Sequence, residues 1–199
     1  MFGEEAKAHL HGHLRWARDA LIWKLDGLGE YDVRRPMTAT GTNLLGLVKH
    51  VAVWDSRYLG EVFGRPFPEA LPRWDDASAR GADHWATMDE SRADIVGLFE
   101  RVCAHTDATI DALALDDLGY VPWWDEEVPL FNVMLHCLSD TTRHAGHADI
   151  LRESIDGAVG FERGASPGHG RDAGFWSARR RMIEGVAEAA STDGPNPPA

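Results

Sequence analysis

The sequence has little cysteine and no long run of apolar residues. Only Cys103 and Cys137 occur among 199 residues, without a Cys-x-x-Cys spacing, so neither a disulfide framework nor a thiolate metal site is indicated. No apolar run reaches the roughly 20 residues that span a bilayer, and the first residues lack the pattern of a secretory signal. We therefore expect a cytoplasmic protein without a membrane partner.

Basic side chains are also scarce. Lys and Arg total 20 against 32 Asp and Glu, which gives a formal net charge of −12. A protein that binds nucleic acid needs a basic face from which counterions can be released. The one basic cluster, Arg179 to Arg181, lies in an amphipathic stretch and is expected to be a solvated helix face. Nucleic acid is therefore excluded as a partner, and a small-molecule substrate is expected instead.

No segment alternates apolar and polar residues with period two, which argues against a sheet. Apolar residues instead recur every three to four positions, as amphipathic helices require. The expected helices cover residues 4–26, 44–63, 89–113, 129–155 and 173–190. We predict an all-α fold, an antiparallel four-helix bundle with an additional C-terminal helix. Residues 1–190 are expected to form a single domain, and residues 191–199 a disordered, proline-rich tail.

The connection over residues 65–88 is long and rich in proline, aspartate and glycine. Loops of this length within a compact domain are often functional. His84 lies here among charged and small residues and is expected to be solvated.

The predicted helix 129–155 carries polar residues on one face. His136, Asp140 and His144 follow one another at intervals of four, and His147 comes three positions later. His50, centred in another apolar helix, can add a ligand from the facing side. Two ligands one turn apart and a third from a second helix form an open triad, as in catalytic metal sites. The same spacing is equally compatible with core histidines that hydrogen-bond to one another.

These residues carry a family resemblance. The combination resembles the DinB-like superfamily, notably its actinobacterial branch, from the first helix to about Gly157. The matching motifs are Thr40-Gly41-Thr42, Lys49-His50 and Asp140-x-x-x-His144-x-Gly146-His147. The resemblance implies a DinB-like bundle in which His50, Asp140 and His144 hold a divalent ion. Because the family more often has Glu or His where this chain has the shorter Asp140, His136 and His147 remain alternatives for that ligand.

The resemblance also implies an activity, although the sequence identifies no catalytic residue. The superfamily includes the mycothiol-using maleylpyruvate isomerase and other thiol-dependent transferases. We therefore expect a metal-dependent enzyme that activates mycothiol, a similar low-molecular-weight thiol, or water for transfer, isomerisation or hydrolysis of a small molecule. Zn is the expected metal, with Ni, Mn or Fe as alternatives. The competing hypothesis is a non-catalytic metal-binding or stress-associated bundle that acts by ligand binding or dimerisation.

Association is a separate expectation. The sequence has eight tryptophans, more aromatic surface than one small core readily hides, and this predicts a homodimer through helix faces.

Overall fold

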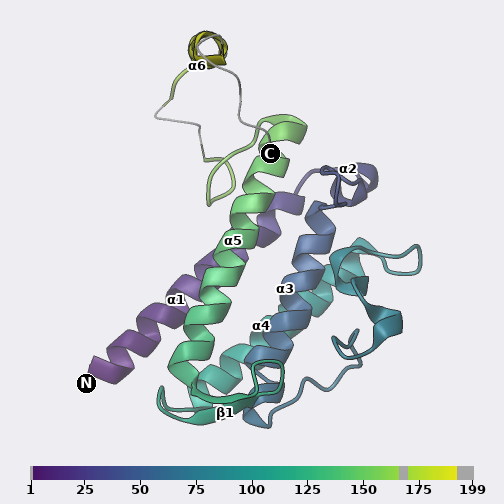
Figure 1. The fold of residues 1–199 in the computed structure, drawn as a ribbon, viewed down its shortest axis with the longest axis vertical. Coiled ribbons are helices and arrows are strands. Elements are labelled where there is room, and N and C mark those ends of the chain that lie inside the picture. Colours follow the sequence, from purple (N-terminus) through teal and green to yellow (C-terminus); the bar gives the residue numbers. More distant parts are fainter. Residues whose placement is uncertain (1, 166–169, 192–199) are drawn as a thin grey trace.

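Four long helices form the body of the protein in the computed structural model, which describes residues 2–165 and 170–191. These are α1 (Phe2–Ile22), α3 (Leu44–Tyr58), α4 (Arg92–Ala112) and α5 (Leu130–Asp156). Helix α6 (Ala173–Ser191) stands apart from them (Figure 1) and has no buried residue. The predicted all-α bundle with an additional C-terminal helix is confirmed. The single-domain boundary stays a prediction, and the expected tail lies outside the described residues from position 192 onward.

Shorter elements connect the long helices. They are α2 (Glu30–Arg34) and the 3-10 turns η1 (Trp23–Leu25), η2 (Glu61–Phe63), η3 (Ala77–Ala79) and η4 (Ala82–His84). No helix in the described part of the chain combines the length and apolarity needed to traverse a bilayer.

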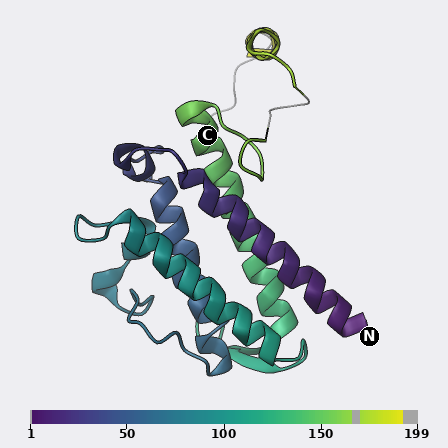
Figure 2. The same ribbon diagram turned by 180° about the vertical axis from the view of Figure 1, so that it is seen from behind.

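The directions of the helices decide which faces meet. Helix α3 runs antiparallel to α5, and α1 runs antiparallel to α4. Helices α1 and α5 rise side by side in the same direction, as Figures 1 and 2 show from opposite sides. The long connection between α3 and α4 returns the chain to the end of the bundle where α3 began, so these two helices are parallel. The antiparallel order thus holds for two pairs of helices, one of which carries the candidate site.

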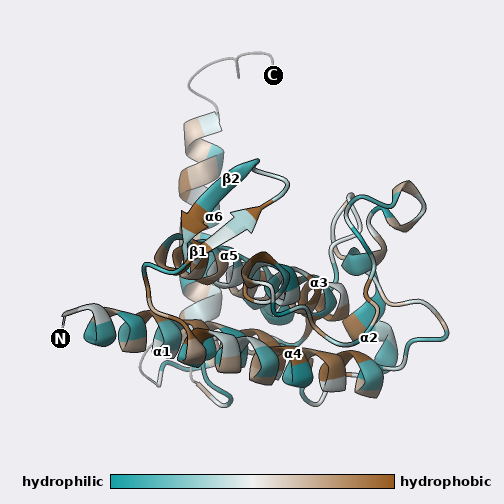
Figure 3. Ribbon diagram, turned by 90° about the horizontal axis from the view of Figure 1, so that it is seen from below, coloured by the Kyte–Doolittle hydropathy of each residue, from teal (hydrophilic) through white to brown (hydrophobic). Residues whose placement is uncertain are grey.

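The amphipathic pattern of the helices determines which side chains fill the interior of the bundle. Apolar and polar residues alternate in stripes along α1 and α4 (Figure 3). The buried apolar side chains form two clusters, one around Leu21, Val48 and Phe99 and the other around Leu14 and Leu130. Burial of such side chains removes apolar surface from water and is the main force that holds the helices together.

A buried charge network ties α1 to its neighbours. Arg18 is only 2% exposed and donates to Asp55 of α3 at 2.8 and 2.9 Å. It also donates to Asp107 of α4 at 2.9 Å, and Asp107 contacts His11 and Arg15 at 2.8 Å each. Buried charges are tolerated when they are paired in this way.

A small hairpin precedes α5 and was not expected from the sequence. Strands β1 (Leu118–Val121) and β2 (Glu126–Pro129) pair antiparallel, with Leu118 opposite Pro129 and Val121 opposite Glu126. The two buried positions of β1 are Gly119 and Val121, so a single apolar side chain represents the buried face of that strand. A Cβ atom on Gly119 would lie 2.7 Å from side-chain atoms of η2. Glycine at this position therefore lets the hairpin lie close to η2. With one apolar side chain on the buried face, the apolar–polar alternation of β1 is too short to recognise in the sequence.

Candidate metal centre

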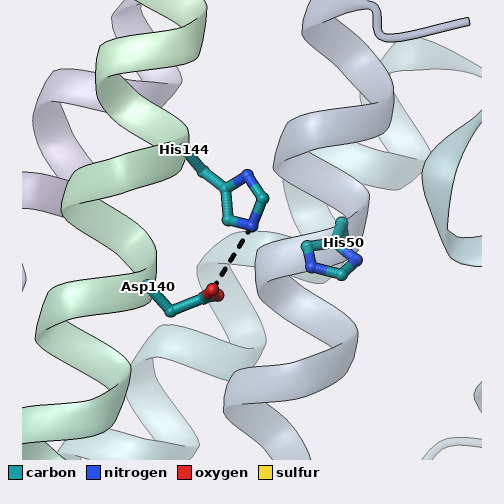
Figure 4. A group of neighbouring side chains, drawn as sticks. All are labelled: His50, Asp140 and His144. Atoms are coloured by element: carbon teal, nitrogen blue, oxygen red, sulfur yellow. Dashed lines mark ion pairs between the residues drawn. The ribbon is translucent and has the colours of Figure 1, made fainter. Parts of the chain in front are cut away.

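His50 and the pair Asp140 and His144 meet across the interface between α3 and α5. Figure 4 shows the two helices presenting these side chains to one another. One ligand atom from each of the three lies within 4.8 Å of the others. Nε2 of His144 is 3.5 Å from Oδ1 of Asp140, and the two imidazole rings are 4.7 Å apart, edge to face. The structure thus brings together all three residues predicted to hold the ion.

The chemistry of this donor set fits a divalent transition metal. Two imidazoles and one carboxylate are ligands that Zn²⁺ and related ions accept. Nε2 is the nitrogen of His144 that faces Asp140, so it is the one placed to share an ion with that carboxylate. Nδ1 of His144 is buried and has no hydrogen-bond partner among the described residues.

Electrostatics keep the carboxylate ionised. Burial alone would raise the pKa of Asp140, but its contact with His144 and the charges of the surrounding histidines lower that pKa below its ordinary value. Side-chain exposure is 13% for His50, 15% for His144 and 37% for Asp140. The three groups are therefore sheltered without being sealed from small molecules.

Asp83, from η4, orients His50. Its Oδ2 accepts a hydrogen bond from Nδ1 of His50 at 2.7 Å and another from the Trp54 indole at 3.1 Å. Burial opposes ionisation of Asp83, yet the hydrogen bond from His50 and the charge of His84 lower the pKa of Asp83 to about 2. Because Nδ1 is engaged, Nε2 is the nitrogen of His50 left for an ion. A carboxylate behind a ligating histidine is the usual arrangement in protein metal sites.

His50, Asp83 and His84 form a second group with metal-ligand atoms within 4.8 Å of one another. The rings of His50 and His84 are stacked, 4.5 Å apart and only 17° from parallel. The ligating lone pairs of imidazole lie in the ring plane, so two stacked rings direct them along parallel planes rather than toward one point. The group that contains Asp140 and His144 is therefore the better candidate for an ion.

The position of η4 depends on the first turn of α3. Asn43 caps that helix by accepting from the Gly46 amide at 2.8 Å, and its side-chain amide donates to the His84 carbonyl at 3.2 Å. A Cβ on Gly46 would lie 1.9 Å from the same carbonyl oxygen. Lys49 adds a hydrogen bond to the Trp85 carbonyl at 3.1 Å. Glycine at this position thus allows η4 to lie directly on α3, one turn before His50.

A cavity of about 250 Å³ adjoins His50. It lies between α3 and the segment 72–84. Its walls include His50, Trp54, Arg57, Trp74, Arg80 and Asp83.

The alternative ligands lie elsewhere. His136 packs between Tyr58 and Trp124, with ring centroids 4.5 and 4.9 Å away, and belongs to neither group of ligand atoms in the described chain. His147 is 5.5 Å from His144 between ring centroids and is likewise outside both groups.

Sequence reasoning missed Asp83 and the ring contact that His84 makes with His50. The side chain of His84 is 59% exposed, as expected for a solvated residue, but its ring also stacks on His50. The one signal that pointed here was the unusual length of the connection between the second and third long helices.

The family is established by comparison with protein-family models. The model described as mycothiol-S-transferase matches residues 9–157, which cover most of α1, all of α2 to α5 and every residue of the candidate centre. The chain belongs to the mycothiol-S-transferase family. This family is part of the DinB-like superfamily, so the resemblance seen in the sequence is confirmed. Helix α6 lies outside the matched region. A search of curated proteins found no significant match.

Proposed function

We propose that the protein is a metal-dependent enzyme that transfers mycothiol, or a closely similar small thiol, to an electrophilic small molecule. Membership of the mycothiol-S-transferase family supports the thiol and the reaction class. The single observation that carries the metal dependence is the convergence of His50, Asp140 and His144 within 4.8 Å. In this proposal those three residues hold the ion, with Zn²⁺ expected first and Ni, Mn or Fe as alternatives.

A divalent ion bound there would act as a Lewis acid that lowers the pKa of a thiol and favours the nucleophilic thiolate near neutral pH. In the overall transfer the S–H bond breaks, its proton passes to solvent or a base, and the sulfur forms a bond to carbon of the electrophile. The electron pair of the attacked bond leaves with a departing group or, in an addition, remains on the acceptor.

The protein's own residues prepare this site. Asp83 fixes the ring of His50 through Nδ1, and the ionised Asp140 presents its oxygens beside His144. Burial raises the pKa of Cys103 to about 12 and that of Cys137 well above its ordinary value, so neither is a ready thiolate near neutral pH. In this proposal the attacking thiol therefore comes from outside the chain. Neither cysteine is among the ligand atoms grouped near His50.

The competing hypothesis, a non-catalytic metal-binding bundle, predicts a closed or saturated site. The cavity beside His50 instead provides space for a second reactant. This observation favours an enzyme.

The test uses purified protein, mycothiol and a panel of electrophiles, with loss of free thiol as the readout. Metal removal should abolish transfer and added Zn²⁺ should restore it. His144→Ala should lower the rate by more than about 100-fold, because loss of a ligand exceeds the 10- to 100-fold effect of its supporting groups. His105→Ala, a histidine of α4 that contacts the Arg65 carbonyl, is the matched control. Full activity without metal would refute the metal dependence, and metal binding without any turnover would favour the non-catalytic bundle.

We also propose that the protein is a cytoplasmic homodimer. Two free cysteines suit a reducing compartment. Helix α6 exposes several large apolar side chains, which a partner subunit could cover. They are Phe175, Met182, Ile183 and Val186. Sedimentation equilibrium that gave only the monomer mass at micromolar concentrations would refute the dimer.

A further inference from the structure

The cavity beside His50 contains a buried cation that forms no ion pair with a described residue, although Glu61, Asp75 and Asp83 lie in its neighbourhood. Arg57 is 4% exposed, and none of the described carboxylates lies within ion-pair distance of it. Its Nη2 donates to the Pro72 carbonyl, and its guanidinium lies 5.2 Å from the centre of the Trp54 ring. Its Nη1 is buried without a hydrogen-bond partner in the described chain. A buried charge that is incompletely compensated destabilises the protein, which suggests that something else completes it.

The three arginines on the wall of this cavity differ in how they are paired. Arg80, also on the wall, forms no ion pair or hydrogen bond with a described residue. Arg73 is on the wall too, but Glu61 and Asp75 neutralise it at 3.2 and 2.8 Å. The one carboxylate of the wall, Asp83, is committed to His50 and Trp54. Arg57 and Arg80 therefore remain available to an incoming anion.

The remaining walls are flat and aromatic. Trp54 and Trp74 both line the cavity, and each packs edge to face against Trp123, with ring centroids 5.5 and 5.7 Å apart. Small-molecule sites typically combine apolar or aromatic walls with a few polar groups that fix orientation. At about 250 Å³ the cavity is slightly below the roughly 300–1,000 Å³ of drug-sized pockets and suits a small substrate rather than a peptide.

We propose that this cavity binds the electrophilic substrate as a small, planar molecule with a carboxylate, which Arg57 and Arg80 recognise while Trp54 and Trp74 contact its flat body. Arginine is suited to this role because its planar guanidinium matches a carboxylate in geometry. The inference rests on the proposed function only in identifying the bound anion as the electrophile. Binding of the anion itself requires neither thiol nor turnover.

The test compares benzoate with benzamide, its neutral and nearly isosteric counterpart, by isothermal titration calorimetry in the absence of thiol. Benzoate is expected to bind about 10-fold more tightly, the preference that a charged hydrogen bond provides. Arg57→Leu should lower the affinity for benzoate by about 10-fold and leave the affinity for benzamide unchanged. Arg101→Leu removes a positive charge that is paired with Glu69 on the surface of α4, and it should leave both affinities unchanged.

Several outcomes would overturn the inference. Equal affinities for benzoate and benzamide, or a preference that survives Arg57→Leu, would show that the cavity does not select an anion through Arg57. A preference that His144→Ala abolishes and Arg57→Leu does not would place the carboxylate on the candidate metal centre instead. If circular dichroism shows that Arg57→Leu does not fold, Arg80→Leu provides the test. It should lower the affinity for benzoate by about 3-fold and leave that for benzamide unchanged. An unchanged ratio of the two affinities would refute the inference.

This experiment separates the two proposals. Selective benzoate binding together with absent thiol transfer would leave the cavity assignment intact and refute the transferase. Thiol transfer to electrophiles without any preference for an anion would support the transferase and refute the cavity assignment.

Discussion

Asp83 and His50 are joined by a 2.7 Å hydrogen bond, although they are 33 positions apart in the chain. The bond connects η4, in the long connection, to the middle of α3. It engages Nδ1 of His50 and so determines which nitrogen faces Asp140 and His144. The candidate centre is therefore built from two helices and one loop rather than from helices alone.

Asp83→Asn should weaken metal binding without loss of helical structure. The amide retains the shape of the carboxylate but not the charge that favours the Nδ1–H tautomer of His50, and loss of such a supporting group typically lowers metal affinity by about 10- to 100-fold. Competition with a chromophoric chelator measures the affinity. Asp89→Asn, an exposed change in the same connection, is the control. Equal affinities in the two variants would mean that Asp83 does not support the centre.

Gly46→Ala should displace η4 from α3. The new Cβ would lie 1.9 Å from the His84 carbonyl oxygen, so the backbone of η4 has to move and take Asp83 with it. We expect a loss of about 1–3 kcal/mol in the free energy of unfolding, typical of overpacking, and weaker metal binding. Urea unfolding and chelator competition measure the two effects. Gly12→Ala in α1, where no atom lies within 4 Å, should be neutral or stabilising, and a similar loss there would contradict the steric explanation.

The helical part of the centre could be predicted because it follows from periodicity. Asp140 and His144 lie one turn apart on α5, so their common face is fixed once the segment is helical. His50 was predicted as the partner because it is centred in the apolar stretch that forms α3. The antiparallel packing of α3 on α5 then brings these residues together.

The loop part could not be predicted in the same way. Asp83 reaches His50 only because Gly46 permits a close approach and Asn43 holds the His84 carbonyl, and no periodic pattern encodes these contacts. The hairpin was missed for a related reason, since Gly119 replaces a side chain on the buried face of β1. Both features depend on glycines whose lack of a side chain matters only in the folded structure.

Native Cys103 and Cys137 should react very slowly with Ellman's reagent. Burial raises the pKa of both thiols, that of Cys103 to about 12, so the reactive thiolate is scarce near neutral pH. We expect labelling at pH 8 at least about 100-fold slower than in urea-unfolded protein. Cys103→Ser should retain thiol-transfer activity. Rapid labelling of the folded protein together with inactivation would point to a cysteine nucleophile instead.

Asp107 should make the protein sensitive to acid. Burial opposes its ionisation, but His11, Arg15 and Arg18 together lower the pKa of Asp107 below its ordinary value of 3.8. A carboxylate with a lowered folded-state pKa stabilises the protein above the unfolded pKa, and this contribution disappears as the pH falls through the lower folded value. Asp107→Asn should therefore reduce stability at pH 7 by about 2 kcal/mol and flatten the loss of stability below about pH 4.

Urea unfolding at a series of pH values checks this expectation for Asp107. Asp19→Asn, an exposed change on α1, is the control and should leave the profile unchanged. An acid profile that is identical in Asp107→Asn and the unmodified protein would contradict the proposed role of this network.

Separate replacement of each histidine tests the candidate centre most directly. His50→Ala and His144→Ala should purify nearly free of metal while remaining helical, because each removes one of the three proposed protein ligands. Asp140→Ala should lose most of the metal, whereas Asp140→Glu keeps a carboxylate and should therefore retain the metal. His136→Ala is the control, since that ring packs on Tyr58 and Trp124 rather than with the ligand atoms. Metal analysis of the purified variants gives the answer, and binding should weaken on acidification as protons compete for the imidazole lone pairs. Full metal content in both His50→Ala and His144→Ala would show that these histidines are packing residues, and the proposed metal-dependent transferase would then lose the centre on which it rests.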